Sequence, residues 1–336
     1  MAGPSLRVTM AQVAKAAGVS RATVSRALSD SSVVDERTRD HVLAVADQLG
    51  YVRNAAATQL AGRSDEMVGL LLRDTRNPAY SYLYTAMLNK AQRCGLFITM
   101  MSAGSAHRDG GETDRLRRLL SLRPAGIFVC SGLIASDDIK PYADQVPTIV
   151  TPRPETSPQL HNVAYDEVGN GRLIADYVAD RGHKKVAVVL TEPDVSYVEN
   201  LRGKSMCEAL TSRGVQVTVL NGSLLRAPTE LAYRVAGDAK ARRYTAVMFP
   251  NDSHALTFLM EARKIGLKVP EDVGVTGLDG AGVATMIANL TTVEVPIEGA
   301  AEAAIRHMRD LINSPTAKPR IIHETFRGTL VPGGTI

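Results

Sequence analysis

Basic and small polar side chains recur along residues 20–28 at a spacing suited to contact with a DNA groove. On a helix that begins after Ser20, Val24 and Leu28 point to one side and a polar face points to the other. Arginine can donate two parallel hydrogen bonds to the edge of a guanine, so we predict Arg26 as a guanine contact. The hydroxyls of the segment would bind phosphates. The residues predicted on this face are Ser20, Arg21, Ala22, Thr23, Ser25 and Arg26.

A preceding helix and a sharp turn would hold this face in place. Thr9 is a favourable N-cap, and Gln12 three residues later completes a capping box. Gly18 supplies the left-handed backbone that a tight turn between two helices requires. The apolar positions of this first helix follow helical spacing, at Val13, Ala14 and Ala17. The pattern predicts a helix-turn-helix whose second helix enters a major groove.

A third helix is predicted over residues 35–49, with Asp35 as N-cap and Gly50 as the stop. One apolar face would close a three-helix domain, and it consists of Val42, Val45, Ala46 and Leu49.

The opening of the chain resembles that of the lac/galactose repressor (LacI/GalR) family of bacterial transcription regulators. The similarity lies in Val-Thr-Met-Ala-Gln-Val-Ala from Val8, Ala-Gly-Val-Ser from Ala17 and Thr-Val-Ser-Arg-Ala-Leu from Thr23. It continues through 34–50 and, more weakly, along nearly the whole chain. This resemblance implies that the protein is a DNA-binding regulator.

Residues 54–63 (Asn-Ala-Ala-Ala-Thr-Gln-Leu-Ala-Gly-Arg) are expected to form a flexible linker away from DNA, since so short a helix is unstable alone. On DNA, the family resemblance implies a hinge helix paired with its dimer mate in the minor groove. Leu60 then stands where the family places an apolar wedge between base steps. With Thr9, this segment adds Asn54, Leu60 and Ala61 to the predicted DNA-binding residues.

Composition indicates a multidomain protein. The 336 residues are 45% hydrophobic, and the net charge of +4 is mild but basic residues predominate in the first 64. Aromatic residues make up 4% with no Trp, which argues against stacking of single-stranded nucleic acid. Three scattered cysteines suit a reducing compartment. No signal-peptide or membrane-spanning pattern is present, so we expect a cytoplasmic protein without a membrane partner.

From residue 67 onward, short apolar runs alternate with amphipathic helices, which predicts parallel sheets covered on both faces. Two successive sets indicate two doubly wound lobes. The family resemblance implies a periplasmic-binding-protein-like core in which the chain crosses between lobes three times. The expected boundaries are 1–53 for an all-α helix-turn-helix domain, 54–66 for the hinge helix and linker, 67–163 with 294–320 for one lobe, and 164–293 with 321–336 for the other.

Polar side chains follow several predicted strands, and the carboxyl ends of strands in two facing lobes form a cleft. Carboxylates, amides and an aromatic ring there suit a polyhydroxylated or nucleoside-like ligand. By match to the family, Asn251, Asp252 and Asp279 occupy polar ligand positions and Tyr80 a ring-stacking position. The predicted effector-binding residues are Asp74, Tyr80, Ser131, Arg153, Ser196, Asn200, Asn251, Asp252 and Asp279.

One position departs from the family pattern. Many sugar- and base-binding members carry Arg three residues before the glycine that is Gly203 here, whereas this chain has Asn200. Arg202 is nearby, but helical spacing would place it on another side of the helix. The ligand therefore lacks a group that needs a bidentate cation, or the protein binds its effector differently.

These patterns predict a homodimeric repressor that binds a palindromic double-stranded operator and responds to a sugar, phosphosugar or nucleoside. A regulator controlled by a protein co-effector is the alternative, and Asn200 is the feature that points to it. An enzyme using the cleft carboxylates is a third class, unsupported by any nucleophile–base pair, metal-ligand spacing, phosphate loop or nucleotide fingerprint. No cofactor or metal is expected. The sequence names neither the effector nor the operator.

Overall fold

The computed structural model describes residues 8–28, 33–52, 67–74, 76–102, 111–314 and 320–336. The chain divides into two compact units, Met1–Ser64 and Asp65–Ile336.

The small unit contains three helices within its described residues: α1 (Met10–Ala17), α2 (Arg21–Leu28) and α3 (Glu36–Gln48). Thr9 and Gln12 form the predicted capping box, with the Thr9 amide donating to Gln12 Oε1 at 2.7 Å. Gly18 ends α1 in the left-handed conformation, at φ 67°. The Thr38 amide donates to Asp35 Oδ1 at 3.0 Å, which caps α3 as predicted.

The three helices share one small core, and its most deeply buried side chains are Val13, Val24, Ala27, Val42 and Ala46. Leu49, predicted to be apolar and inward, remains 38% exposed because α3 ends one residue before it.

The first α/β part of the large unit, here called the N-lobe, is built on a parallel sheet with strand order β11-β5-β4-β3-β1-β2. The strands are β1 (Met67–Leu72), β2 (Phe97–Ser102), β3 (Gly126–Cys130), β4 (Thr148–Val150), β5 (His161–Tyr165) and β11 (His323–Phe326). The helices of this lobe are α5 (Pro78–Arg93), α6 (Gly111–Ser121), α7 (Ser136–Ala143) and α13 (Ile297–Asn313).

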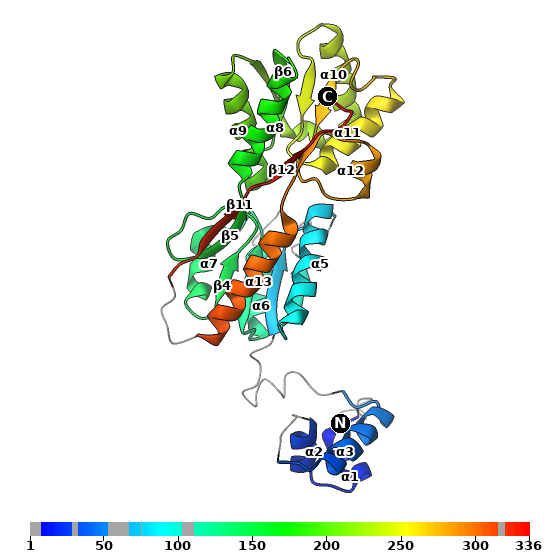
Figure 1. Cartoon of the computed structure of the whole chain (residues 1–336), viewed down its shortest axis with the longest axis vertical. Coiled ribbons are helices and arrows are strands. Elements are labelled where there is room, and N and C mark those ends of the chain that lie inside the picture. The colour runs from blue at the N-terminus through cyan, green and yellow to red at the C-terminus, as the bar shows by residue number, and fades with distance from the viewer. Residues whose placement is uncertain (1–7, 29–32, 53–66, 75, 103–110, 315–319) are drawn as a thin grey trace. The chain divides into compact units, whose positions relative to one another are not determined.

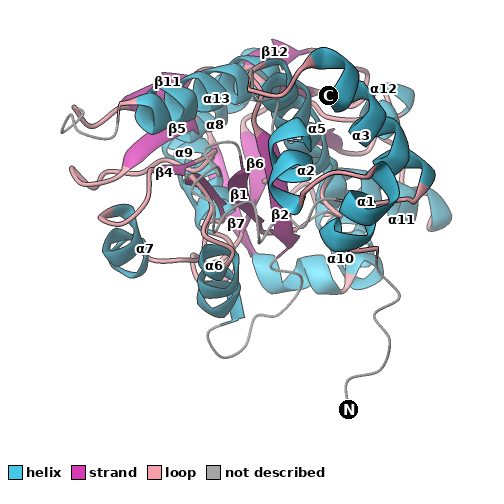
Figure 2. Ribbon diagram, turned by 90° about the horizontal axis from the view of Figure 1, so that it is seen from below, coloured by secondary structure: helices cyan, strands magenta, loops and turns pink. Residues whose placement is uncertain are grey.

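Helices cover both faces of this sheet because its strands are apolar on both sides. Leu70 and Leu72 pack in the same core as α5 and α13, whereas Leu71, between them, packs with α6 and α7. Figure 2 shows α5 and α13 on one side of the strands and α6 and α7 on the other.

The second α/β part, the C-lobe, has a parallel sheet in the order β7-β6-β8-β9. Its strands are β6 (Lys185–Leu190), β7 (Gln216–Asn221), β8 (Ala246–Met248) and β9 (Gly274–Thr276). One core packs the sheet against α8 and α9, and the other packs it against α10 and α11. The helices of this lobe are α8 (Glu167–Asp180), α9 (Tyr197–Ser212), α10 (Pro228–Lys240), α11 (Asp252–Lys264) and α12 (Val283–Ile287), with a 3₁₀ turn, η1, at Gly222–Arg226.

Within the described residues the backbone passes between the lobes three times: from β5 into α8, from β10 (Thr292–Glu294) into α13, and from β11 into β12 (Thr329–Val331). β10 and β12 pair antiparallel at these crossings. The Asp166 amide donates to the carbonyl of Phe326 at 2.8 Å, so the first and third crossings are joined directly. The predicted architecture of a helix-turn-helix followed by two doubly wound lobes is confirmed.

One boundary differs from the prediction. Residues 321–336 were assigned to the C-lobe, but β11 pairs in parallel with β5 inside the N-lobe sheet. Its sequence, His-Glu-Thr-Phe, lacks an apolar run, and the pairing depends on residues more than 150 positions earlier in the chain. The third crossing therefore lies at Arg327 and Gly328. In the described part of the chain, none of the helices is long and apolar enough to cross a membrane.

Candidate functional site

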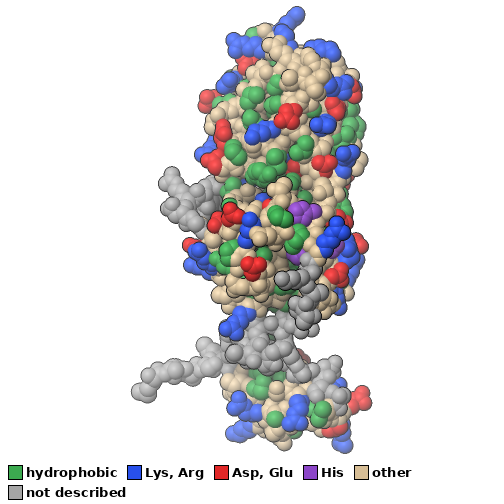
Figure 3. All heavy atoms as spheres, turned by 90° about the vertical axis from the view of Figure 1, so that its left-hand side faces the viewer, with side chains coloured by type: hydrophobic (Ala, Val, Ile, Leu, Met, Phe, Trp, Pro, Cys, Tyr) green, Lys and Arg blue, Asp and Glu red, His purple; other side chains and the backbone are tan. Residues whose placement is uncertain are grey.

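The second helix of the small unit presents a basic face to solvent. Arg21, Ala22 and Arg26 are exposed, whereas Val24 and Ala27 are buried. Figure 3 shows basic side chains on the visible surface of this unit. Two guanidinium groups therefore lie on the exposed face of α2, and an α-helix fits into the major groove of DNA.

The hydroxyl groups at the start of α2 serve the helix itself. Ser20 Oγ accepts from the Thr23 amide at 3.0 Å and lies 2.8 Å from Thr23 Oγ1. Ser20 is therefore the N-cap of α2, and its hydroxyl would have to share this role with a phosphate. Thr9 is likewise engaged in its capping box. The predicted contacts Asn54, Leu60 and Ala61 lie outside the described residues.

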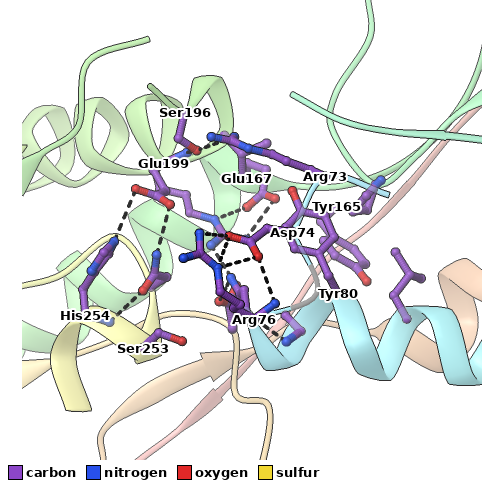
Figure 4. A pocket seen from close by; sticks show the side chains of 18 of the residues that line it. Arg73, Asp74, Arg76, Tyr80, Tyr165, Glu167, Ser196, Glu199, Ser253 and His254 are labelled. Atoms are coloured by element: carbon purple, nitrogen blue, oxygen red, sulfur yellow. Dashed lines mark hydrogen bonds and ion pairs between the residues drawn. The ribbon is translucent and has the colours of Figure 1, made fainter. Parts of the chain in front are cut away.

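A cavity of about 390 Å³ lies between the two lobes of the large unit. Its walls come from the carboxyl ends of strands in both sheets and from the first turns of α5, α8, α9 and α11 (Figure 4). Four carboxylates and three arginines line it, namely Asp74, Glu167, Glu199 and Asp279 with Arg73, Arg76 and Arg202. The other lining residues include Asn77, Tyr80, Tyr165, Ser196, Asn251 and His254.

The centre of this cavity wall is a buried ion-pair cluster. Arg202 Nε donates to Glu167 Oε2 at 2.5 Å, and Nη2 donates to Oε1 at 3.1 Å. Arg202 Nη1 donates to Asp279 Oδ1 at 2.8 Å and to the Pro250 carbonyl at 3.1 Å. All three charged side chains are at most 5% exposed. Since removal of one partner would leave a buried charge uncompensated, the cluster acts as a unit.

Carboxyl groups in this wall have altered affinities for protons. Burial raises the pKa of Glu167 and of Asp279, and Arg202 opposes the increase in both. Behind Asp279, burial and the charge of Asp279 raise the pKa of Asp252 to about 7. Asp252 accepts from Thr292 Oγ1 at 2.6 Å and from the Gly280 amide at 2.7 Å. Asp252 therefore binds its proton more tightly than an exposed aspartate does.

The backbone of Asp279 is unusual. Its φ of 142° lies in a region that side-chain-bearing residues rarely adopt. The conformation is fixed by two strand-like bonds, from the Asp279 amide to Val293 O at 3.1 Å and from the Val295 amide to Asp279 O at 3.0 Å. These bonds join the backbone of Asp279, whose carboxylate lines the cleft, to the crossing that leads into α13.

Arg73 and Asn77 of the N-lobe donate hydrogen bonds to the C-lobe across the cavity. Arg73, which follows β1, donates to the Val195 carbonyl and to Ser196 Oγ, the latter at 3.3 Å. Asn77 Nδ2 donates to Asp279 Oδ2 at 3.5 Å. A ligand in the cavity would therefore meet groups from both lobes, and the relative position of the lobes would affect its binding.

Five of the predicted effector-binding residues line this cavity: Asp74, Tyr80, Ser196, Asn251 and Asp279. The other four do not. Ser131 donates to Glu112, Asn200 Nδ2 donates to the Thr191 carbonyl at 2.7 Å, and Asp252 lies behind the wall. Arg153 Nη2 pairs with Glu155 at 3.0 Å and lines a second cavity.

Arg202 lies on another side of α9 than Asn200, as predicted, but it is the Arg202 side that lines the cleft. Asn200 and Arg202 both point into the protein, each 5% exposed, because α9 is buried on two sides. One side faces the end of β6 near Thr191, and the other faces the start of α8. Helical spacing separates the two residues but does not say which side meets the cleft.

Glu167 and Glu199 were also missed. Both stand in the first turn of a helix that begins at the carboxyl end of a strand, at α8 and α9. That position is a usable signal, since such turns converge on a cleft in α/β lobes. Among the described residues, no cluster of His, Cys, Asp or Glu could hold a metal ion.

Two family models match this chain, one in each compact unit. Residues 9–54 match the model described as bacterial regulatory proteins, lacI family, and residues 175–336 match a periplasmic binding protein-like domain. The HTH-type transcriptional regulator CelR of Thermobifida fusca is 30% identical over 334 residues, covering 95% of this chain and 96% of that protein. The chain belongs to the lacI family of bacterial regulatory proteins.

Solved structures with the same fold include a lac repressor dimer bound to operator and the anti-inducer ONPF, with a TM-score of 0.80 and 22% identity over 98% of this chain and 99% of that one. A complex of the regulator CelR with cellobiose has a TM-score of 0.67 and 26% identity over 98% of this chain and 100% of that one. This lacI-family member is thus a DNA-binding transcription regulator, and its relatives are regulators rather than enzymes.

Proposed function

We propose that this protein is a homodimeric repressor that binds a palindromic operator in the bacterial cytoplasm and is controlled by a small sugar- or nucleoside-like effector in the interlobe cavity. The observation that carries the proposal is one chain with an exposed basic helix face and a polar cavity lined by both lobes. The proposed division is 1–53 for DNA binding, 54–66 for the hinge, and two lobes for the effector.

In the proposed operator complex, Arg21, Ala22 and Arg26 contact base edges, and Ser25 contacts a phosphate. A twofold-symmetric dimer places two copies of α2 about one helical turn of DNA apart, which explains why the expected operator is palindromic. Selection of binding sites from random duplex DNA tests this directly. Recovered sites without twofold symmetry would contradict a dimer bound in this way.

An exposed apolar surface on α12 supports self-association. Val283, Met286 and Ile287 are 63%, 79% and 81% exposed, although a short helix normally buries such side chains. Burial against a second copy would remove this apolar surface from water. Sedimentation of Ile287→Glu should show weakened dimers, whereas Tyr233→Glu, on exposed α10, should not.

The polar lining favours an effector rich in hydroxyl groups. Carboxylate and amide oxygens accept hydrogen bonds from hydroxyls, and a tyrosine ring packs on the apolar face of a sugar ring. The relative whose structure contains cellobiose has the same fold, which makes sugars the first compounds to test. A thermal-shift screen would find a binder, because a ligand of the folded state raises the unfolding temperature.

Effector control requires coupling between cavity and operator. A ligand with different affinities for two lobe arrangements biases the equilibrium, typically by about 1–3 kcal/mol. Because coupling is reciprocal, operator DNA must change effector affinity by the same factor. Calorimetric titration of the effector with and without operator measures this factor. Equal dissociation constants would favour the alternative, a regulator that answers to a protein co-effector.

A further inference from the structure

Arg202 lines the cavity, yet it already makes four hydrogen bonds to protein groups. A guanidinium group has five N–H donors in a planar fork. In Arg202, Nε and Nη2 hold both oxygens of Glu167 at 2.5 and 3.1 Å, and Nη1 holds Asp279 and the Pro250 carbonyl at 2.8 and 3.1 Å. Glu167 thus occupies the edge of the guanidinium group that would otherwise bind a phosphate or carboxylate through two hydrogen bonds.

The other two arginines of the cavity also have partners. Arg76 Nε and Nη2 hold Asp74 at 3.0 and 2.8 Å. Arg73 donates from its terminal nitrogens to Val195 and Ser196 across the cleft. Since four carboxylates accompany these three arginines, the wall presents mainly hydrogen-bond acceptors and an excess of negative charge.

We infer that Arg202 is a positioning residue that makes the cavity selective for uncharged, hydroxyl-rich effectors and excludes phosphorylated or carboxylated ones. Arg202 acts through its partners: it fixes the carboxylates of Glu167 and Asp279, whose outer lone pairs then accept ligand hydroxyls. The inference rests on the proposed function. It restricts the candidate effectors, from sugars, phosphosugars and nucleosides, to the uncharged compounds among them.

The exclusion follows from electrostatics in a buried site. An anionic ligand group that binds Arg202 would have to displace Glu167 from it, and the released carboxylate would remain buried without its cation. It would also approach Asp279 and Glu199, which repel it. A neutral hydroxyl meets neither penalty, because it donates to a carboxylate oxygen while the ion pair stays intact.

The experiment is calorimetric titration of the full-length protein with inorganic phosphate at constant pH and ionic strength. The wild type should show no saturable phosphate binding in the cavity. Glu167→Gln removes the charge that occupies the arginine fork, so saturable phosphate binding should appear. Its affinity should exceed the detection limit set by the wild type by roughly tenfold, the factor that corresponds to one pKa unit of charge interaction. Adding Arg202→Met to Glu167→Gln should abolish the gain.

Glu199→Gln is the matched control. It removes one negative charge from the same cavity, but Glu199 contacts Thr191 and Asn251 rather than Arg202. An equal gain in Glu199→Gln would show that general charge, and not release of Arg202, governs anion binding, and would overturn the inference. Saturable phosphate binding by the wild type that disappears in Arg202→Met would overturn it as well. If circular dichroism shows that Glu167→Gln is unfolded, Asp279→Asn frees the other side of the guanidinium and gives the same comparison.

A positioning role also predicts how neutral ligands respond. For a sugar found to bind, Arg202→Lys should retain part of the affinity, since it keeps a cation beside Asp279, whereas Arg202→Met should lose it. The phosphorylated form of that sugar should bind the wild type more weakly than the parent, and tighter binding of the phosphorylated form would contradict the inference. Failure of every sugar to alter operator binding would instead defeat the proposed effector control, and the phosphate titration would still report on Arg202.

Discussion

Asn77 in the N-lobe and Asp279 in the C-lobe are joined by a hydrogen bond of 3.5 Å between Asn77 Nδ2 and Asp279 Oδ2. The other end of the same amide caps α5, since Asn77 Oδ1 accepts from the Ala79 amide at 2.9 Å. One side chain thus fixes the start of a helix and reaches across the cleft.

The two roles of Asn77 can be separated. Asn77→Ser retains a capping hydroxyl but is too short to reach Asp279, so unfolding free energy should stay within about 0.5 kcal/mol of the wild type. Asn77→Ala loses the cap as well and should lose about 1 kcal/mol. Urea unfolding measures both. Equal losses would mean that the cap contributes little, while effector affinity should fall in both variants.

Arg26→Ala should weaken binding to the selected operator by roughly 1–3 kcal/mol and relax sequence preference at one position. The reason is that Arg26 is exposed on the α2 face predicted to meet base edges. Fluorescence anisotropy on operator and on random duplex measures the difference. Lys15→Ala, at an exposed position of α1, is the control. It should change the affinity for operator and for random DNA by the same factor, because a phosphate contact does not depend on base sequence. Equal weakening on both DNAs by Arg26→Ala would rule out base reading.

Leu60→Ala addresses the wedge expected in the hinge, which lies outside the described residues. The variant should reduce DNA bending and specific affinity, because the apolar side chain no longer separates base steps. Salt-sensitive binding to random DNA should be nearly unchanged. A circular-permutation gel assay reports the bend, and an unaltered bend angle would refute the wedge.

Asp279 offers a test of stored backbone strain. At a φ of 142°, glycine has less backbone strain than a residue with a Cβ. Asp279→Gly and Asp279→Ala both remove the carboxylate that pairs with Arg202, so their difference isolates the backbone. We expect the glycine variant to be more stable in urea by about 1 kcal/mol, despite the greater flexibility of its unfolded chain. A more stable alanine variant would show that no strain is held there.

The pKa of Asp252, raised from 3.8 to about 7, predicts a pH dependence of stability. The folded protein retains a proton that the unfolded chain releases at lower pH, so this group's contribution falls as pH rises from 3.8 to about 7 and is constant above that. Thermal unfolding between mildly acidic and mildly alkaline pH should therefore show a decline in the wild type that Asp252→Asn flattens.

Asp74→Asn is the control for this pH dependence. The hydrogen bond from Arg76 lowers the pKa of Asp74, so Asp74 stays ionised in the folded protein throughout that window. Its variant should keep the decline seen in the wild type. If Asp252→Asn keeps the decline too, another group in the cluster carries the proton.

Features that depend on near neighbours along the chain could be predicted from the amino-acid sequence alone. The capping box at Thr9, the left-handed Gly18 and the cap at Asp35 act over three or four residues, and each was predicted from its own segment. The alternation of strands and helices was equally local, because an apolar run of a parallel strand is buried on both faces wherever it lies. Four cavity-lining residues were predicted because they follow strand ends, and for the last three the family resemblance agreed: Asp74, Tyr80, Asn251 and Asp279.

The set of side chains that share the cleft depends on contacts between distant parts of the chain. Arg202 meets Glu167 from 35 residues away and Asp279 from 77 residues away, and no local period encodes such a meeting. Strand β11 joins the N-lobe sheet in the same way, through pairing with β5 across the chain. The role of a buried charge depends on its partners. Without them, its desolvation destabilises the folded protein, and with them the cost is offset. Asn200 and Arg202 differ in role for that reason, although they lie two positions apart in one helix.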